Sequence, residues 1–166
     1  MSSLQVLQSG SEISSPRLGR LYDYWLGLKG NRVGPKREQI EPATIRGDLP
    51  FVWLVEVLDG GEDFYFRLAG SELKSFMGHD NAGKRLSERP QTPYFKNVRR
   101  VFSACVSERL PILVGPVRTS FPERSHLAIT VLTMPLSENG RDVSMLFGGF
   151  ESTLVALPQT ETVLGS

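Results

Sequence analysis

A histidine, an aspartate and three glycines stand close together in the segment RLAGSELKSFMGHDNAGKRLSE, residues 67–88. Closely spaced glycines between a strand and a long helix can bind a phosphate group through backbone N–H groups. Gly70, Gly78 and Gly83 are too far apart for such a loop, and the helix that would follow Gly70 has only about two turns. We therefore interpret the three glycines as turn positions of the fold.

His79 and Asp80 could form a catalytic pair, but they are neighbours in a predicted turn. That position does not aim both side chains at one reacting atom, and no serine or cysteine nucleophile motif accompanies them. We predict a solvated turn histidine, a surface position for His126 and no catalytic residue. The alternative, a small hydrolase or isomerase of α+β type, would draw its acid–base group from Glu56, Glu72, Asp80 or His126.

The chain has one cysteine, Cys105, and two histidines. These numbers argue against a structural zinc site and leave no pair for a disulfide within these residues. Cys105 lies on the apolar stripe of a predicted helix, so we expect a buried thiol in the core.

The 166 residues suit one domain, and their formal net charge is +1. Such a balance argues against a surface that coats nucleic acid or an anionic membrane, since those partners require many uncompensated Lys and Arg side chains. No apolar stretch approaches the roughly 20 residues that span a bilayer, and residues 1–15 do not resemble a signal peptide. We therefore expect a cytoplasmic protein with no membrane span and no nucleic-acid partner.

The first fifty residues divide into a tail and a helical part. Residues 1–14 are rich in Ser and Gln and are predicted to be a disordered tail, and residues 15–50 to hold an N-terminal helix and a connector. Ser15 and Pro16 are typical of a helix start, and Gly30 of a helix end. One apolar stripe follows this amphipathic helix and consists of Leu18, Leu21, Tyr22, Trp25 and Leu26.

Residues 51–151 are predicted to form the core of the domain, and residues 152–166 a C-terminal tail. Two strands, short helices, one long helix and three strands follow one another without strand–helix alternation, which argues against a doubly wound parallel sheet. The sequence predicts an α+β fold in which a five-stranded antiparallel sheet carries the short helices and the long helix on one face. The strands are expected at residues 51–57, 64–68, 112–120, 126–134 and 143–150, and the helices at 71–77 and 92–110.

Two turn signals order the last three strands. Asn139 and Gly140 are typical of a hairpin, so residues 126–134 should pair directly with residues 143–150. Gly115 and Pro116 interrupt the strand at residues 112–120. Because proline has no N–H for a ladder, we expect this strand at an edge of the sheet.

This order of elements is similar to that of the PAS domain, which has two strands, short helices, a long helix F and three further strands. The segment FYFRLAGSELKSFMGHDNAGKRLSE resembles the PAS pattern of a second strand that runs into a short helix, then Gly, a polar residue, Gly and a hydrophobic-x-acidic ending. The segments YDYWLGLKG, GPKREQIEP, LPFVWLVEV and MPLSENGRDVSMLFGGFE resemble a bacterial subfamily of stand-alone PAS proteins with an N-terminal helix extension. The resemblance covers residues 18–151.

The resemblance implies a sensory or interaction module with a small-molecule cavity between the long helix and the sheet, and it does not imply catalysis. Flavin-adduct relatives use a cysteine in an Asn-Cys-Arg motif near the short helices, where Cys105 does not lie. Haem-binding relatives use a histidine of the long helix, and residues 92–110 contain none, so the cofactor is unknown and both types are disfavoured. The candidate cavity residues are Trp53, Phe66, Phe76, Tyr94, Phe95, Val98, Phe102, Leu132 and Met134.

The apolar stripe of the N-terminal helix must be buried, because each large apolar side chain gains roughly 1.5–3 kcal/mol when it leaves water. It can pack on its own sheet or on a second copy, and PAS relatives often dimerise through such helices. We predict a homodimer that acts on a signalling protein, with Leu18, Leu21, Tyr22, Trp25 and Leu26 in its interface.

A ligand-free scaffold is a third alternative beside the sensory module and the enzyme. An empty apolar cavity would favour ligand sensing, a buried carboxylate or histidine in it would favour an enzyme, and the lack of a cavity would favour a scaffold.

Overall fold

The computed structural model describes residues 4–118 and 126–155 of the chain. Within these ranges, six antiparallel strands form one sheet in the order β1-β4-β5-β6-β2-β3. The strands are β1 (Leu4–Val6), β2 (Val52–Leu58), β3 (Asp63–Ala69), β4 (Ile112–Arg118), β5 (Leu127–Leu136) and β6 (Met145–Leu154). The α+β class and the antiparallel sheet are confirmed, and the described residues add one strand to the predicted five.

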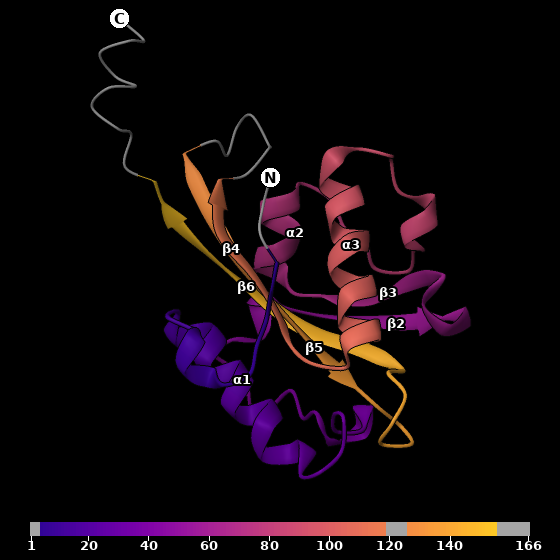
Figure 1. The fold of residues 1–166 in the computed structure, drawn as a ribbon. Coiled ribbons are helices and arrows are strands. Elements are labelled where there is room, and N and C mark those ends of the chain that lie inside the picture. Colours follow the sequence, from indigo (N-terminus) through magenta and orange to yellow (C-terminus); the bar gives the residue numbers. More distant parts are fainter. Residues whose placement is uncertain (1–3, 119–125, 156–166) are drawn as a thin grey trace, which may run out of the picture.

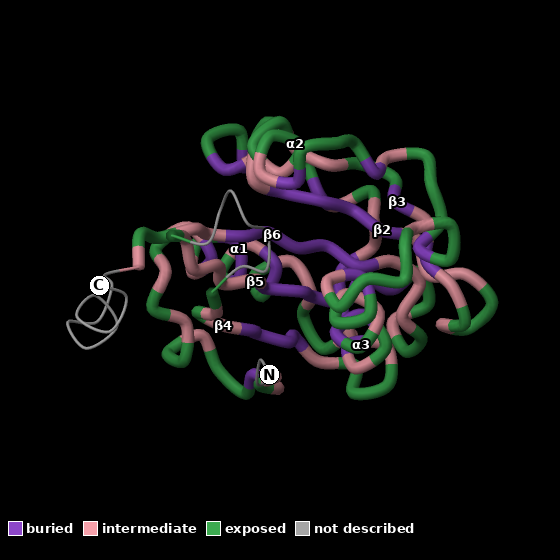
Figure 2. Tube along the Cα trace, turned by 90° about the horizontal axis from the view of Figure 1, so that it is seen from above, coloured by how far each residue is buried: buried purple, intermediate pink, exposed green. Residues whose placement is uncertain are grey.

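Helices cover both faces of the sheet (Figure 1). The short helix α2 (Ser71–Met77) and the long helix α3 (Pro93–Glu108) lie on one face, and α1 (Pro16–Lys29) lies on the other. Figure 2 shows that the central strands are buried between these layers, while the outer sides of the helices are exposed. The sheet therefore separates two apolar cores. Short 3-10 turns occur at Gly10–Glu12, Arg37–Gln39, Leu49–Phe51, Asp59–Gly61 and Leu86–Glu88.

The helices begin where the sequence predicts. The side chain of Ser15 accepts a hydrogen bond from the N–H of Leu18, and that of Thr92 accepts one from the N–H of Phe95. Proline follows each of these caps in the first turn, where its missing N–H costs nothing. These caps fix where α1 and α3 enter their layers.

Helix α1 packs its apolar stripe on the sheet of its own chain. The indole Nε1 of Trp25 donates a hydrogen bond to the backbone oxygen of Pro135 at 2.8 Å. Gly149 of β6 makes close packing possible, because a Cβ at this position would lie 2.6 Å from the side chain of Leu21. The helix therefore belongs to the folded core of one chain.

This packing leaves little of the stripe for the predicted dimer interface. Four members of the stripe are at most 5% exposed, so they have no free surface to offer a second copy: Leu18, Leu21, Tyr22 and Trp25. Leu26, at the margin of the stripe, is 44% exposed. Between the two partners that the stripe could have, the structure selects the chain's own sheet.

The N-terminal segment differs from the predicted tail. Strand β1 pairs with β4, with Leu4 opposite Val114, and the following Leu7 is 1% exposed. The pattern of Leu4, Gln5 and Val6 is a short apolar–polar alternation, and its pairing covers part of an otherwise open sheet edge. Strand β6 likewise extends to Leu154, into the predicted C-terminal tail; residues 156–166 lie outside the described part of the chain.

The predicted edge position of residues 112–120 is wrong for the first half of β4. Residues 112–114 lie between β1 and β5. Pro116 follows the last residue that β1 covers, and the register with β5 shifts between Val114 and Val117, which is where a proline is tolerated. Residues 119–120 are outside the described ranges. Strands β5 and β6 pair directly with each other, so the predicted hairpin is confirmed.

Candidate functional site

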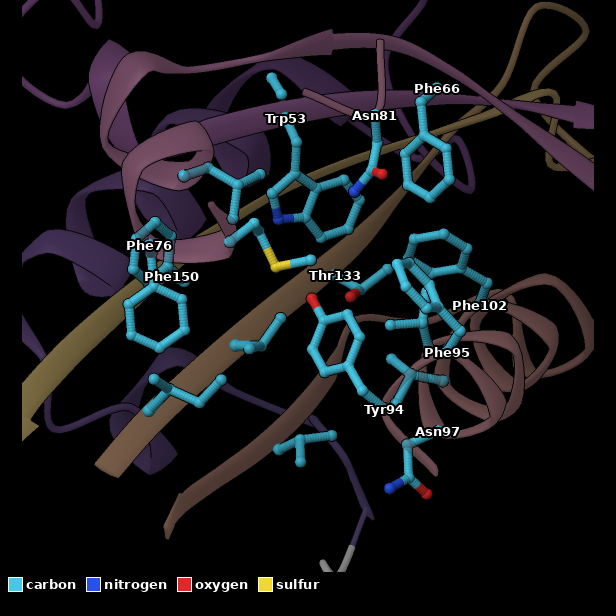
Figure 3. A pocket seen from close by; sticks show the side chains of 18 of the residues that line it. Trp53, Phe66, Phe76, Asn81, Tyr94, Phe95, Asn97, Phe102, Thr133 and Phe150 are labelled. Atoms are coloured by element: carbon cyan, nitrogen blue, oxygen red, sulfur yellow. The ribbon is translucent and has the colours of Figure 1, made fainter. Parts of the chain in front are cut away.

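A cavity of about 530 Å³ lies between the sheet and the helices α2 and α3 (Figure 3). This volume falls within the range of about 300–1,000 Å³ that is typical of small-molecule sites. Strands β2, β3, β4, β5 and β6 contribute wall residues from one side. Gly148 of β6 leaves room for the indole of Trp53, because a Cβ there would lie 2.2 Å from that ring.

The cavity wall is largely aromatic. Phe102 of α3 lies in the middle of one group of rings, with its centroid 5.4 Å from that of Trp53 and 6.2 Å from that of Phe66. Two further pairs complete the wall, Phe76 with Phe150 at 5.3 Å and Tyr94 with Phe95 at 4.9 Å. The apolar stripe of α3 thus supplies much of the wall, together with residues of α2 and the sheet.

Two buried polar side chains face this apolar space, Asn81 from the segment after α2 and Thr133 from β5 (Figure 3). Asn81 is 8% exposed and Thr133 is 0% exposed. Neither Asn81 Oδ1 nor Thr133 Oγ1 has a hydrogen-bond partner among the described residues. A buried polar atom without a partner costs about 1–3 kcal/mol. Both oxygens have almost no accessible surface, so a bound molecule would reach them only after neighbouring side chains move.

Backbone pairing holds Asn81 over the cavity. The N–H of Gly83 donates to the backbone oxygen of Phe66 at 2.7 Å, and the N–H of Phe66 donates to that of Lys84 at 2.9 Å. Gly83 has a positive φ of 84°, which a glycine adopts without strain. Gly78 and Gly83 are thus turn positions, as predicted, and the turn at Gly83 helps to bury a polar residue. Gly70 instead precedes α2 with an extended backbone, where a Cβ would lie 2.2 Å from the backbone oxygen of Pro50.

The hydroxyl of Tyr94 also points into the cavity, from the first turn of α3 (Figure 3). Burial raises the pKa of Tyr94, so this hydroxyl stays protonated near neutral pH. It is a neutral group that can both donate and accept a hydrogen bond.

The basic residues that line the cavity lie at its exposed rim. Lys74, His79 and Arg118 are exposed, and the Lys74 Nζ is 3.5 Å from a carboxylate oxygen of Asp80. The exposed position of His79 agrees with the predicted turn histidine. Among the described residues that line the cavity there is no Asp or Glu.

Seven of the nine candidate cavity residues line the cavity, and two do not. Leu132 and Met134 are both 0% exposed and pack in the core on the α1 side of the sheet. Successive side chains of a strand point to opposite faces, so Val131 and Thr133 take the cavity side instead. The seven residues on the wall are Trp53, Phe66, Phe76, Tyr94, Phe95, Val98 and Phe102.

Cys105 lies in the core and does not line the cavity. It is 0% exposed, which confirms the predicted buried thiol, and burial raises its pKa above that of a free cysteine. Within the described ranges, no three His, Cys, Asp or Glu side chains come together to hold a metal ion. No helix in the same ranges is long and apolar enough to cross a membrane.

In a comparison with protein families, a family model described as PAS domain matches residues 13–150. A search of curated proteins and a search of solved structures found no match. The matched range includes α1 as well as the cavity and runs into β6. Because the model covers most of the chain, and the fold has the expected sheet and long helix, this chain belongs to the PAS domain family.

Proposed function

We propose that this chain is a sensory and regulatory module that binds a small, largely apolar ligand in the cavity and acts through contacts with another protein. The proposal rests on one observation, an aromatic cavity of about 530 Å³ whose wall contains the buried and unpaired Asn81 Oδ1 and Thr133 Oγ1. A ligand that supplies their hydrogen bonds would be held in one orientation by an otherwise apolar site. Membership of the PAS family agrees with this role, because PAS domains are generally sensory and commonly mediate protein interactions.

The cavity favours ligand sensing over the two alternatives. An enzyme would need an acid–base group inside the cavity, whereas the described lining contains no carboxylate and its histidine, His79, is exposed at the rim. A ligand-free scaffold would be expected to fill the space between α3 and the sheet. It would also be expected to pair Asn81 and Thr133, because each unpaired atom reduces stability.

The partner, the location and the oligomeric state are further parts of the proposal. The apolar stripe of α1 is covered by the chain's own sheet, so a homodimer would have to use another surface. A cytoplasmic location agrees with the single buried thiol at Cys105, which takes part in no disulfide. The signalling partner would bind the outer surface of the module and respond to whether the cavity holds a ligand.

Native mass spectrometry of the freshly purified chain, with a cavity-filling variant beside it, tests ligand binding. Val98→Trp places a large ring in the cavity from α3, and Ser103→Trp adds the same ring at an exposed position of that helix. We expect a bound small molecule on the wild type and on Ser103→Trp, released under denaturing conditions and absent from Val98→Trp. Equal adducts on all three chains would contradict a site in the cavity.

A further inference from the structure

We infer that the segment from Gly78 to Gly83 is a lid that opens over the cavity, and that Asn81 sets how often it is open. The opening itself does not depend on a ligand, but the use of the lid as an entrance rests on the proposed function. Four features of the segment carry the inference: its position, its two ends, its few ties to the rest of the chain, and the buried amide that it carries when closed.

The segment forms part of the cavity wall and also faces solvent. His79 and Asn81 line the cavity, whereas Asp80 and Gly83 are exposed and do not line it. His79 is itself exposed at the rim, so an outward displacement of the segment would widen the mouth of the cavity.

A glycine with a positive φ stands at each end of the segment. The φ angle is 83° at Gly78 and 84° at Gly83, a conformation that glycine adopts without strain. Neither glycine is needed for close packing, because a Cβ at either position would meet no atom within 4 Å. Both therefore serve the path of the backbone, and such positions at the ends of an element commonly act as the hinges of lids.

Few interactions tie the residues between these glycines to other elements. Among the described residues, the hydrogen bonds of residues 79–82 stay within residues 79–84. Outside the segment, the carboxylate of Asp80 lies 3.5 Å from the Nζ of Lys74, and the His79 ring lies 6.4 Å from a ring of α3. An exposed ion pair of this kind contributes little to stability. The closed position is therefore held weakly.

Closure of the lid buries an amide oxygen that has no partner. Asn81 is 8% exposed, and its Oδ1 accepts no hydrogen bond from any described residue. When the segment moves outward, water can hydrate this oxygen, so opening recovers the free energy that closure costs. The closed lid is thus opposed by its own side chain, and local opening requires far less than global unfolding.

Amide hydrogen exchange, followed by NMR on the full chain, tests the lid. The N–H of Gly83 donates to the backbone oxygen of Phe66 at 2.7 Å, a bond that opening breaks, so its protection reports the closed population. Amides of the central strand β5 report global unfolding. We expect Gly83 to be at least about tenfold less protected than these amides, with an exchange rate that low concentrations of urea leave unchanged. Equal protection and an equal response to urea would overturn the lid.

Substitutions test the role of the buried amide. Asn81→Leu removes the unpaired oxygen, so it should raise the protection of Gly83 at least about fivefold. Asn97→Leu, the same substitution at an exposed lining position of α3, is the control and should leave that protection unchanged. Should Asn81→Leu not fold, Asn81→Asp would bury a charge on closure and should lower the protection of Gly83 by about tenfold or more. Unchanged protection in the Asn81 variant would contradict its role.

Stopped-flow fluorescence with the neutral probe N-phenyl-1-naphthylamine tests the use of the lid as an entrance. A lid that controls passage slows entry and exit together, so Asn81→Leu should lower the association and dissociation rate constants by the same factor and leave Kd unchanged. A changed affinity at an unchanged association rate, or no binding of the probe, would overturn the role of the segment as an entrance.

The outcomes separate this inference from the proposed function. Unchanged protection of Gly83 in Asn81→Leu, together with a bound molecule in native mass spectrometry, would overturn the lid and keep the cavity as a ligand site. Raised protection without any bound molecule would keep the opening of the segment and overturn the proposed function.

Discussion

Thr133→Val is expected to stabilise the ligand-free protein and to weaken ligand binding. Thr133 is 0% exposed, and its Oγ1 has no hydrogen-bond partner among the described residues. Valine has nearly the same shape and is equally suited to strand β5, so the substitution leaves the packing of the sheet intact. What it removes is a buried hydroxyl that has lost its hydration, at a cost of about 1–3 kcal/mol.

We expect the free energy of unfolding to rise by about 1 kcal/mol, the lower end of that range, because the cavity is large enough to admit water. For a chain of 166 residues this corresponds to a rise in Tm of about 2–4 °C. The affinity for the ligand should fall about tenfold with the loss of one hydrogen bond.

Urea denaturation and calorimetric titration measure the two effects on the same samples. Thr130→Val, a half-buried position of β5 that does not line the cavity, is the matched control and should change the free energy of unfolding by less than about 0.5 kcal/mol. A loss of 1 kcal/mol or more in Thr133→Val would show that the hydroxyl is well paired. An unchanged ligand affinity would show that it does not contact the ligand. Either result would refute the reasoning.

Three further predictions concern the rest of the fold. Trp25→Ala should lower the free energy of unfolding by about 3–5 kcal/mol, because Trp25 is 1% exposed and packs on its own sheet. The control Leu26→Ala should change the free energy of unfolding by less than about 0.5 kcal/mol. A Trp25→Ala protein that keeps its stability but changes its mass in light scattering would contradict this packing. Burial acts to raise the pKa of Asp63, but hydrogen bonds, among them those from Ser87, hold it below its ordinary value. The stability from this carboxylate is therefore fully present above about pH 4 and is lost as the pH falls through the lowered pKa. Asp63→Asn should have a lower free energy of unfolding than the wild type at neutral pH, and this difference should disappear in acid. Denaturation curves that show the same difference at every pH would contradict this prediction. Burial raises the pKa of Cys105, so a thiol reagent should label this residue only on unfolding, and rapid labelling of the folded protein would be the contrary result.

Much of the fold could be predicted from local signals. Ser15 and Thr92 with their following prolines mark the starts of α1 and α3, and the Asn139–Gly140 turn marks the β5–β6 hairpin. Strand β1 was missed because three residues are too short for a clear alternation, and its pairing with β4 is a long-range contact. The apolar stripe of α1 does not by itself show which surface the helix packs on, since the same face fits the chain's own sheet or a second copy.

The candidate site was only partly predictable for similar reasons. The periodicity of α3 identifies the rings that line the cavity, such as Phe95 and Phe102. The alternation along β5 gives two faces, but it does not say which face meets α3, and Leu132 and Met134 were therefore assigned to the wrong one. Asn81 lies in a polar turn segment that is typical of solvent, and its burial depends on the pairing of residues 83–84 with Phe66.

The most direct test of the central claim, that the space between α3 and the sheet is a ligand site, is native mass spectrometry of the freshly purified chain. The wild type, Val98→Trp and the control Ser103→Trp are measured in parallel, after circular dichroism has shown that all three are folded. We predict a bound small molecule on the wild type and on Ser103→Trp, and none on Val98→Trp. A bound molecule on none of the three chains, or equal amounts on all of them, would contradict the claim.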